Sequence, residues 1–395
     1  MMTQIASKII VVGGGISGSM AALKAAELGA DVTLLSNIAP RRSPSASLRC
    51  GINAVLDGGA QNDTAEIHTR ETIACGGGIA DQNAVEDMCK TAPSIVNMLD
   101  RMGVLFNRTK EGLIEQYQSK GSTKPRTAAA GNSTGHQVIC ALDLQIRRKV
   151  LEGRVKLIEG WEFLSLIIDN NNACRGVVAA NLYNMEIRAY TADAVIICTG
   201  GYDGLMGGLN PNLDGFGIAN CFTQGAKLAN LKFGSVGGLL VDNCHATNIS
   251  GLFAAGGASS QYHGSAILEG NNILASIYGG IVAGNSAVQY SINNRSVLET
   301  VSNSILEASI ARENNVKEYF TQHEGEENIR TLKNELCLAI KEKSPDKVEQ
   351  LKTRFNNVEL YDLTEWSNTE IIHMRRFIKC LELANAIILA LSGEK

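Results

Sequence analysis

The chain has 395 residues, a net charge of −4 and no run of basic residues. This charge pattern excludes the electrostatic footprint of a protein that binds nucleic acid or an acidic membrane surface. Glycine is abundant, at 40 residues, and charged residues make up only 19%, a balance that suits a nucleotide-binding α/β protein. The ten cysteines include no pair at the spacing of zinc or iron–sulfur ligands, so we expect reduced thiols and no metal site.

Targeting signals are not evident at the beginning of the sequence. The first residues lead directly into a predicted strand, without the apolar core of a signal peptide, which predicts a cytoplasmic location. Residues 270–294 carry no charged side chain, but their Asn, Gln and Ser residues are too polar for a membrane span. We therefore expect a buried helix there and no transmembrane segment.

The first predicted elements are a strand, a turn, a helix and a second strand, over residues 8–37. Gly13, Gly15 and Gly18 have G-x-G-x-x-G spacing directly after an apolar, β-branched run. The first glycine permits a tight turn, the second lets the backbone approach a pyrophosphate, and the third allows close packing of the helix on the strand. This unit predicts a dinucleotide site, with Ser36 and Asn37 where the second strand meets the ribose.

Two later stretches indicate which dinucleotide is bound. DAVIICTGG (193–201) and SGLFAAGGASS (250–260) are apolar strands that end in small residues. The chain thus returns twice to the edge of the sheet, as a ligand the size of FAD requires, and it lacks a second G-x-G-x-x-G motif for NAD(P). We expect Thr199, Gly200, Gly256 and Gly257 to contact FAD.

The remaining elements follow from periodicity and turn residues. Helices are predicted over 82–102, with Asp81 as cap, and over 134–150, with Ser133 or Thr134 as cap. Residues 154–201 read as strand, antiparallel ribbon and strand, and we interpret the ribbon as a solvent-side structure. Charged amphipathic helices follow over 299–322, 327–344, 345–358 and 369–393.

These elements predict an α/β fold. A Rossmann-like FAD-binding domain, made of a parallel sheet with an antiparallel ribbon, spans residues 1–298, and a C-terminal helical domain spans 299–395. In the last helix, Met374, Arg375, Arg376 and Lys379 are interpreted as a solvated face, with a surface for an anionic partner as the alternative.

Several segments together resemble the flavoprotein subunits of succinate dehydrogenase and fumarate reductase, and L-aspartate oxidase. The similar pieces include VVGGGISGSMAALKAAELGADVTLLS, GGGIADQNAVEDMCKTAP, STGHQVICAL, DGFGIANCFTQGAKLANLKF and HGSAILEGNNIL. The resemblance covers most of residues 8–395 and implies an FAD cofactor. It also places Ser43, Gly51, Phe163 and Asp214 near the cofactor, and it directs the backbone N–H groups of the run Asn271, Asn272 and Ile273 toward the flavin.

Departures from the family pattern concern both the cofactor and the substrate. Pro44 stands where relatives carry the His that bonds to flavin, so the resemblance implies non-covalent FAD. Ile267 stands in place of an Arg that grips a dicarboxylate, and a second ligand, a His, falls at Phe233 or Gly234. Relatives insert a capping domain between those two positions. Because the two residues are adjacent here, we expect the capping domain to be absent.

Two candidate catalytic residues remain. His263 is either a surviving acid–base group or a packed loop residue. Arg49 either raises the potential of the flavin by its charge or points outward to a phosphate or to solvent. Gly257 takes the place of a family Glu that contacts the ribityl chain, so the FAD contacts are reorganised as well.

Three functions stay open at this point. The first is an FAD-dependent electron-transfer subunit, in which a partner subunit covers the open flavin near residues 233–270 and supplies substrate groups or iron–sulfur centres. The second is a catalytically degenerate flavin-binding or scaffold subunit. The third is a fumarate reductase or succinate dehydrogenase with its cap supplied by another chain.

Overall fold

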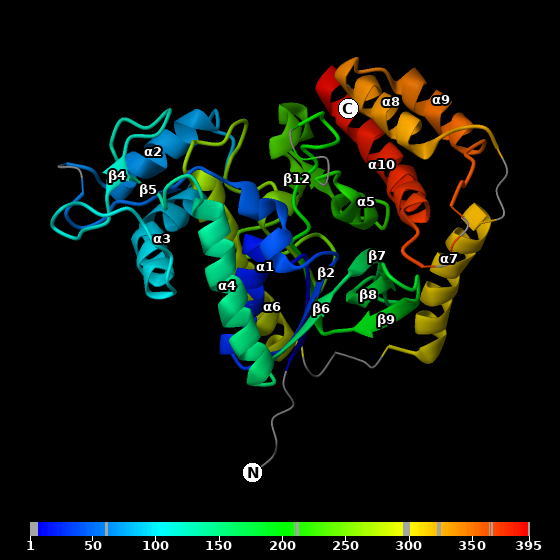
Figure 1. Cartoon of the computed structure of the whole chain (residues 1–395), viewed down its shortest axis with the longest axis horizontal. Helices are drawn as coiled ribbons and strands as arrows, with labels where there is room; N and C mark the ends of the chain where they lie inside the picture. The colour runs from blue at the N-terminus through cyan, green and yellow to red at the C-terminus, as the bar shows by residue number, and fades with distance from the viewer. Residues whose placement is uncertain are drawn as a thin grey trace, which may run out of the picture.

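A parallel five-stranded sheet forms the centre of the protein (Figure 1). The structure is a computed structural model that describes residues 7–59, 62–208, 210, 213–294, 301–321, 325–362, 364 and 366–393. The strand order is β13-β10-β1-β2-β6, and all neighbours pair in parallel. The strands are β1 (Lys8–Val12), β2 (Asp31–Ser36), β6 (Val155–Glu159), β10 (Ala194–Ile197) and β13 (Leu252–Ala254). The predicted α/β fold is confirmed.

The two faces of this sheet bury different sets of side chains. Ile9 and Val11 of β1 belong to one apolar cluster, and Ile10 and Val12 belong to the other, as the two-residue period of a strand requires. The first face is covered by helices α1 (Ile16–Glu27), α4 (Thr134–Leu151) and α6 (Asn271–Asn293). The predicted buried helix over 270–294 is therefore confirmed as α6.

Helices α1 and α6 pack against each other at very short range because their contact residues are small. A Cβ added at Gly280 would lie 2.5 Å from the Ser17 carbonyl oxygen, and one at Gly284 would lie 2.6 Å from that of Ala21. This close approach fixes α6 on α1 and so fixes where the start of α6 lies relative to the glycine turn.

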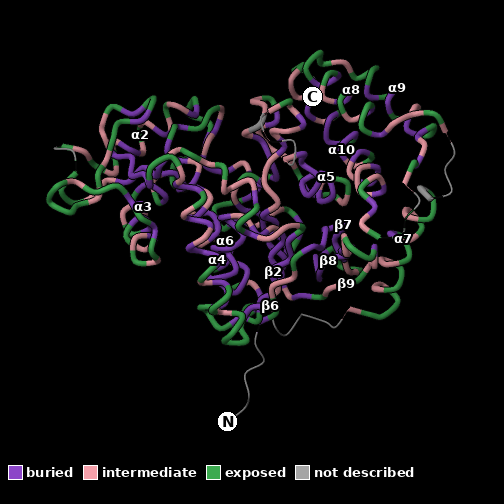
Figure 2. The backbone as a smooth tube through the Cα atoms, viewed as in Figure 1, coloured by how far each residue is buried: buried purple, intermediate pink, exposed green. Residues whose placement is uncertain are grey.

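The second face of the sheet is covered by an antiparallel sheet and by the C-terminal helices. The antiparallel strands are β7 (Trp161–Ile168), β8 (Cys174–Asn181) and β9 (Ile187–Thr191). Seven of the eight residues in both β7 and β8 are buried (Figure 2). The expectation of a solvent-side ribbon is thus wrong, because the parallel sheet covers one side of this ribbon and helices cover the other.

The C-terminal helices follow the predicted pattern. They are α7 (Asn303–Thr321), α8 (Ile329–Lys341), α9 (Pro345–Phe355) and α10 (Thr369–Ser392), and α5 (Phe216–Phe222) lies beside α10. Leu383 and Ile387 of α10 share one apolar cluster with Val195 and Ile197 of β10. The predicted domain boundary at 298/299 lies outside the described residues, and the division into two domains stays a prediction.

A smaller lobe holds α2 (Ala65–Cys75) and α3 (Gln82–Arg101), together with the short strands β3 (Ile52–Asn53), β4 (Gln116–Tyr117) and β5 (Thr127–Ala128). The Asp81 carboxylate accepts a hydrogen bond from the Ala84 N–H at 2.9 Å, which confirms the predicted cap of α3. Ser133 precedes α4 without capping it, whereas the Thr134 hydroxyl accepts from the Ala130 N–H.

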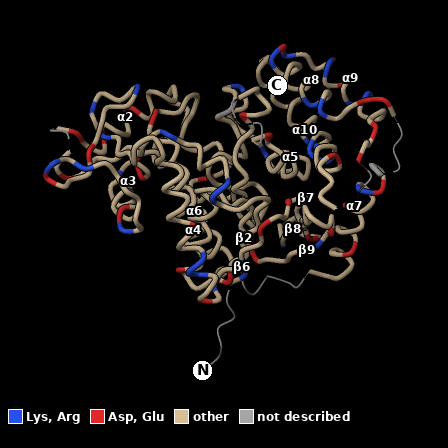
Figure 3. The backbone as a smooth tube through the Cα atoms, in the orientation of Figure 1, with Lys and Arg blue, Asp and Glu red and all other residues tan. Residues whose placement is uncertain are grey.

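The hairpin β11 (Leu228–Ala229) and β12 (Gly238–Leu239) encloses the short helix η3 (Leu231–Val236). Phe233 and Gly234 are consecutive residues within η3, and their non-helical φ/ψ angles make a kink there. Charged residues of both signs are spread over the outer helices and loops (Figure 3), while α6 carries none. Within the described parts of the chain, every helix is too short or too polar to cross a membrane.

Candidate functional site

A cleft opens at the carboxyl ends of β1, β2 and β10, the edge of a parallel sheet where nucleotides bind. Its walls come from the turn between β1 and α1, the end of β2, the start of β7, the start of α5 and one side chain of α10. Ten of the predicted cofactor residues line it: Gly13, Gly15, Ser36, Asn37, Ser43, Phe163, Thr199, Gly200, Asp214 and Gly257.

The three glycines of the turn meet different steric demands. Gly13 has φ of +106°, and a Cβ there would lie 2.3 Å from the Cys198 carbonyl oxygen. A Cβ at Gly18 would lie 1.8 Å from the Gly13 carbonyl oxygen. Gly15 has φ of −69°, and its Cβ would meet only the Ser45 hydroxyl, at 3.1 Å. Gly13 and Gly18 are therefore required by the fold, whereas Gly15 keeps the approach to the cleft open.

The start of α1 presents positive charge to this cleft. No side chain caps the Gly15 position and no acidic residue lies in the first turn. The Ile16 N–H donates to the Ser45 hydroxyl at 3.2 Å. An uncapped helix start with its dipole aimed at the cleft is a binding site for an anion such as a pyrophosphate.

Two buried hydroxyl groups in the cleft lack a partner. The Ser43 Oγ and the Thr199 Oγ1 are buried, and neither makes a hydrogen bond among the residues that the structure describes. Both residues line the cleft, and buried hydroxyls without partners cost free energy unless a ligand or water satisfies them. These two groups fit the polar atoms of a dinucleotide.

Ser36 and Asn37 contribute differently to the cleft. The Ser36 hydroxyl accepts from the Gly14 N–H at 3.2 Å and donates to the Ile38 carbonyl at 2.7 Å, so it braces the glycine turn. Asn37 is exposed at the rim. Of these two residues, only Asn37 has a side chain without a hydrogen bond to another described residue, so it can meet a ribose hydroxyl.

An arginine from the last helix reaches this cleft. Arg376 of α10 lines it and pairs with the Glu162 carboxylate, with Nε at 2.9 Å, and with that of Asp214, with Nη1 at 3.2 Å. Both acids are buried, and their charge raises the pKa of Arg376 although burial alone would lower it. Arg375 is only 4% exposed. The interpretation of these arginines as a solvated face is wrong, since both point into the protein.

A second group of predicted residues lies at the start of α6, apart from the walls of the cleft. Asn271 is fully buried: its Oδ1 accepts from Asn53 Nδ2 at 2.9 Å and faces His68 Nε2 at 2.9 Å, and its Nδ2 donates to the Thr72 hydroxyl. Its backbone N–H donates to Leu268. The Asn271 side chain therefore holds the helix start in place and is not available to a ligand.

The helix start itself is open. Gly270 has φ of +92° and no side chain caps α6. Within the run Asn271 to Ile273, the backbone N–H groups of Asn272 and Ile273 remain available to a ligand. The dipole of α6 would favour an electron-rich group at this position. Gly51 packs against β5, where its Cβ would lie 2.3 Å from the Ala128 carbonyl oxygen, and Gly256 packs against Ser17 of α1.

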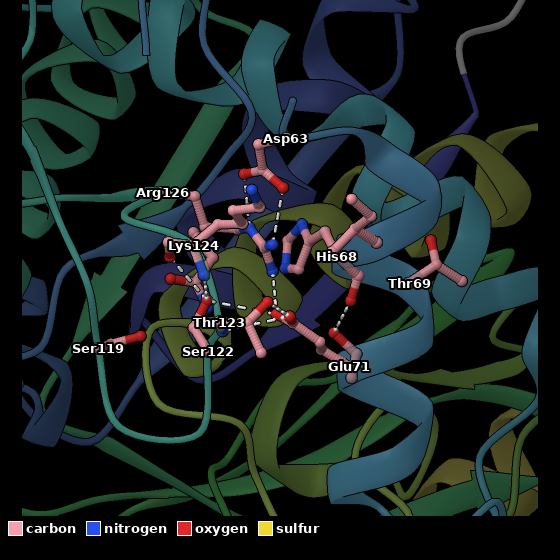
Figure 4. Close-up of polar contacts among 12 residues, drawn as sticks. Asp63, His68, Thr69, Glu71, Ser119, Ser122, Thr123, Lys124 and Arg126 are labelled. Atoms are coloured by element: carbon pink, nitrogen blue, oxygen red, sulfur yellow. Dashed lines mark hydrogen bonds and ion pairs between the residues drawn. The ribbon is translucent and has the colours of Figure 1, made fainter. Parts of the chain in front are cut away.

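A buried ion cluster lies beside His68, which contacts Asn271 at the start of α6 (Figure 4). The Arg126 side chain is 0% exposed and donates two hydrogen bonds to the Asp63 carboxylate, at 2.8 Å from Nε and 2.7 Å from Nη2. Its Nη1 pairs with the Glu71 carboxylate. The next residue, Thr127, donates to Asn53, so this cluster and the Asn271 network form one continuous polar layer.

The two candidate catalytic residues have different surroundings. His263 lies in a loop packed on the end of α2, where the Ser265 N–H donates to the Gly76 carbonyl. Burial lowers the pKa of His263 to about 4, and its Nδ1 is sealed from solvent without a partner. A neutral imidazole at pH 7 is a poor proton donor but can still accept a proton. Arg49 is exposed, in agreement with the outward orientation.

Comparisons of the sequence with known proteins assign the chain to a family. The model of the FAD binding domain matches residues 8–223. A succinate dehydrogenase flavoprotein subunit of Bacillus subtilis is 32% identical over 518 aligned residues, which cover 97% of this chain and 88% of that protein. The chain belongs to the succinate dehydrogenase and fumarate reductase flavoprotein family. It carries the FAD-binding domain of that family.

Other relatives match over shorter stretches. A fumarate reductase flavoprotein subunit of Mycobacterium tuberculosis is 32% identical over 229 residues, or 57% of this chain and 38% of that protein. Among solved structures, a quinol fumarate reductase chain of E. coli has a TM-score of 0.88 at 19% identity, over 98% of this chain and 89% of that one. Adenylylsulfate reductase of Archaeoglobus fulgidus has a TM-score of 0.75 at 15% identity, over 97% and 88%. These structures establish the shared fold.

Three residues that line the cleft of this family member are not predicted as cofactor contacts by the sequence: Ser45, Phe216 and Arg376. The sequence does carry a signal for the ion pair between Glu162 and Arg376. Glu162 is the single charged residue in the apolar run WEFLSLII, and a buried carboxylate requires a cation from elsewhere in the chain. The sequence does not indicate which cation that is.

Proposed function

We propose that this protein is an FAD-dependent oxidoreductase subunit that holds FAD without a covalent bond and transfers electrons within a multi-subunit complex. The uncapped glycine turn, with the unpartnered Ser43 and Thr199 hydroxyls beside it, is the observation that carries the proposal. Bound FAD supplies reversible two-electron chemistry. The protein binds and orients it through the start of α1, the hydroxyls and the backbone at the start of α6.

Non-covalent binding rests on Pro44. Pro44 lines the cleft directly after Ser43, and a proline ring offers no nucleophile to the flavin. Precipitation of the flavin-loaded protein with acid should leave all yellow colour in the supernatant. Flavin that stays in the washed pellet would contradict this part of the proposal.

Succinate and fumarate do not suit the site of the isolated chain. By the family resemblance, Ile267 stands at the position of one family cation and Phe233 or Gly234 at that of the other. Residues 233–270 contain Asp242 and Glu269 but no Lys or Arg. A dianion taken out of water costs several kcal/mol or more without fixed positive partners. Neutral His263 does not offset that cost.

We further propose that a second subunit covers the face near residues 233–270. Two observations support the absence of a capping domain: Phe233 and Gly234 are consecutive residues at a kink within η3, and the aligned stretch of the Bacillus subtilis relative is longer than this chain. Closing an active site excludes water and side reactions of the reduced cofactor. A partner would supply that closure, together with substrate groups or iron–sulfur centres.

The first experiment is purification from the native host, followed by a spectrum and reversible reduction with dithionite. A flavin spectrum, full reoxidation and a co-eluting subunit are expected. A colourless preparation would favour a scaffold role. Rapid reoxidation of the reduced protein by fumarate alone would favour a fumarate reductase whose cap comes from another chain.

A pair of glycine variants then tests whether the turn holds the cofactor. Gly15→Ala adds a methyl group that meets only the Ser45 hydroxyl, so the fold should be kept while flavin binding weakens by about tenfold or more. Gly18→Ala should lower both stability and binding, because its methyl group collides with Gly13. Unchanged flavin affinity in Gly15→Ala would sink the assignment of this turn to the pyrophosphate.

A further inference from the structure

A second cavity lies behind the cofactor cleft, between β7, α5, α7 and α10. Its walls include Ser165, Asn220, Arg312, Glu313 and Arg375. Phe216 at the start of α5 lines both this cavity and the cofactor cleft. Phe216 is thus shared by the two spaces, while their polar lining groups differ.

Arg375 enters this cavity with most of its hydrogen-bonding capacity unused. The residue is 4% exposed, and only its Nη2 has a partner, the Glu313 carbonyl oxygen at 3.0 Å. Its Nε and Nη1 have no partner among the described residues. Burial lowers the pKa of Arg375, which is the sign of a charge without full compensation.

No nearby carboxylate neutralises this charge by direct contact. Glu313 is buried, but its Oε1 accepts from the Ser165 hydroxyl at 2.7 Å and lies 3.6 Å from Arg312 Nε. Lys379 also lines the cavity, where its Nζ donates to the Thr223 hydroxyl. The lining residues Arg312, Arg375 and Lys379 outnumber the acids Glu313 and Glu382 by one charge.

An unpartnered acceptor accompanies the unpartnered donors. Asn220 is 1% exposed, its Nδ2 donates to the Phe163 carbonyl at 3.3 Å, and its Oδ1 has no partner. A water molecule could bridge such groups, but water would leave the positive charge uncompensated. An anion that accepts from Arg375 and also donates to Asn220 satisfies both requirements.

We propose that this cavity binds a small oxyanion that carries a proton, namely inorganic phosphate, on Arg375 and Asn220. Hydrogen bonds between a guanidinium and a phosphate oxygen are among the strongest in proteins. Asn220 belongs to α5, whose first residue, Phe216, lines both the cavity and the cofactor cleft. The site is distinct from the proposed pyrophosphate turn and does not depend on the flavin function.

Titration calorimetry with inorganic phosphate at constant ionic strength tests this on the flavin-loaded protein, in which the glycine turn is filled. One saturable site is expected. Arg375→Met should weaken binding by about tenfold or more, as the loss of charge-assisted hydrogen bonds predicts. Arg354→Met removes an arginine outside the cavity and serves as the matched control, with unchanged binding. The absence of a saturable site, or equal binding in Arg375→Met, would overturn the proposal.

Other anions and a second variant serve as further controls for this measurement. Sulfate carries no proton at pH 7 and cannot donate to Asn220, so it should bind more weakly than phosphate. Methyl phosphate, whose phosphate group is mostly a dianion without a proton at pH 7, should also bind more weakly. If Arg375→Met fails to fold, Asn220→Asp places a negative charge beside the anion and should abolish binding. A preparation without flavin is also informative, because phosphate held at the empty glycine turn would survive Arg375→Met.

Discussion

The buried arginine Arg126 offers a direct measure of what holds the lobe around the start of α6. Its side chain is 0% exposed, and the carboxylates of Asp63 and Glu71 are 2% and 10% exposed. Arg354 has the same arrangement at the surface: it pairs with Glu327 and Glu335, and the three side chains are 39%, 24% and 38% exposed. The two clusters differ mainly in burial.

This difference sets the expected free energies of unfolding. Arg126→Met leaves two carboxylates buried without their cation, which costs about 3–5 kcal/mol. Arg354→Met leaves its carboxylates in water, where such pairs contribute about 1 kcal/mol or less. If a domain of this kind has ~5–15 kcal/mol of total stability, the first substitution removes a large share of it and the second very little.

Urea unfolding followed by circular dichroism measures both losses at equal flavin loading, because a bound ligand adds stability of its own. A triple variant, Arg126→Met with Asp63→Asn and Glu71→Gln, should recover most of the loss by removing the unpaired charges. Similar losses in the two methionine variants, or no recovery in the triple variant, would show that burial does not decide the contribution of these clusters.

Three further predictions concern other parts of the structure. Burial lowers the pKa of His245 from 6.5 to about 4, so the unfolded chain binds the proton first as pH falls. The free energy of unfolding should therefore drop by up to about 3 kcal/mol between pH 6.5 and pH 4. His245→Gln should flatten the plot of urea midpoint against pH, and parallel plots for the two proteins would contradict this. Thr199→Val should weaken flavin binding about fivefold while the flavin-free melting temperature holds or rises, since the hydroxyl has no internal partner. Arg376→Met should destabilise the protein by about 3–5 kcal/mol and weaken flavin binding, because Glu162 and Asp214 stay buried; a stable variant with normal flavin affinity would refute that role.

Local signals account for the parts of the fold that the sequence predicts. The glycine turn is specified within six residues, and the strand before it and helix after it follow from periodicity. The helices α8 to α10 are predicted for the same reason, since each has one apolar stripe. The burial of β7 is not visible in this way, because a strand covered on both faces depends on elements more than a hundred residues away.

The polar residues of the site show the same limit more sharply. Arg375 and Arg376 stand between Met374 and Phe377, two buried apolar residues, yet charge alone suggested a solvated face. Their partners Glu162, Asp214 and Glu313 come from β7, the segment before α5, and α7. Spacing along one helix carries no information about acids that reach it through the tertiary fold.

The charge of residues 233–270 bears on what a flavin bound beside them could react with. Residues 233–270 contribute two acids and no base, His263 is neutral at pH 7, and the buried cation Arg126 is already paired with two carboxylates. An incoming dianion would therefore meet repulsion at the surface and no free cation in this segment. A neutral substrate, or electron carriers held in a partner subunit, require no such cation. The buried polar groups of Asn53, His68 and Thr72 hold the start of α6 in either case, so the proposed cofactor side does not depend on how the substrate side is built.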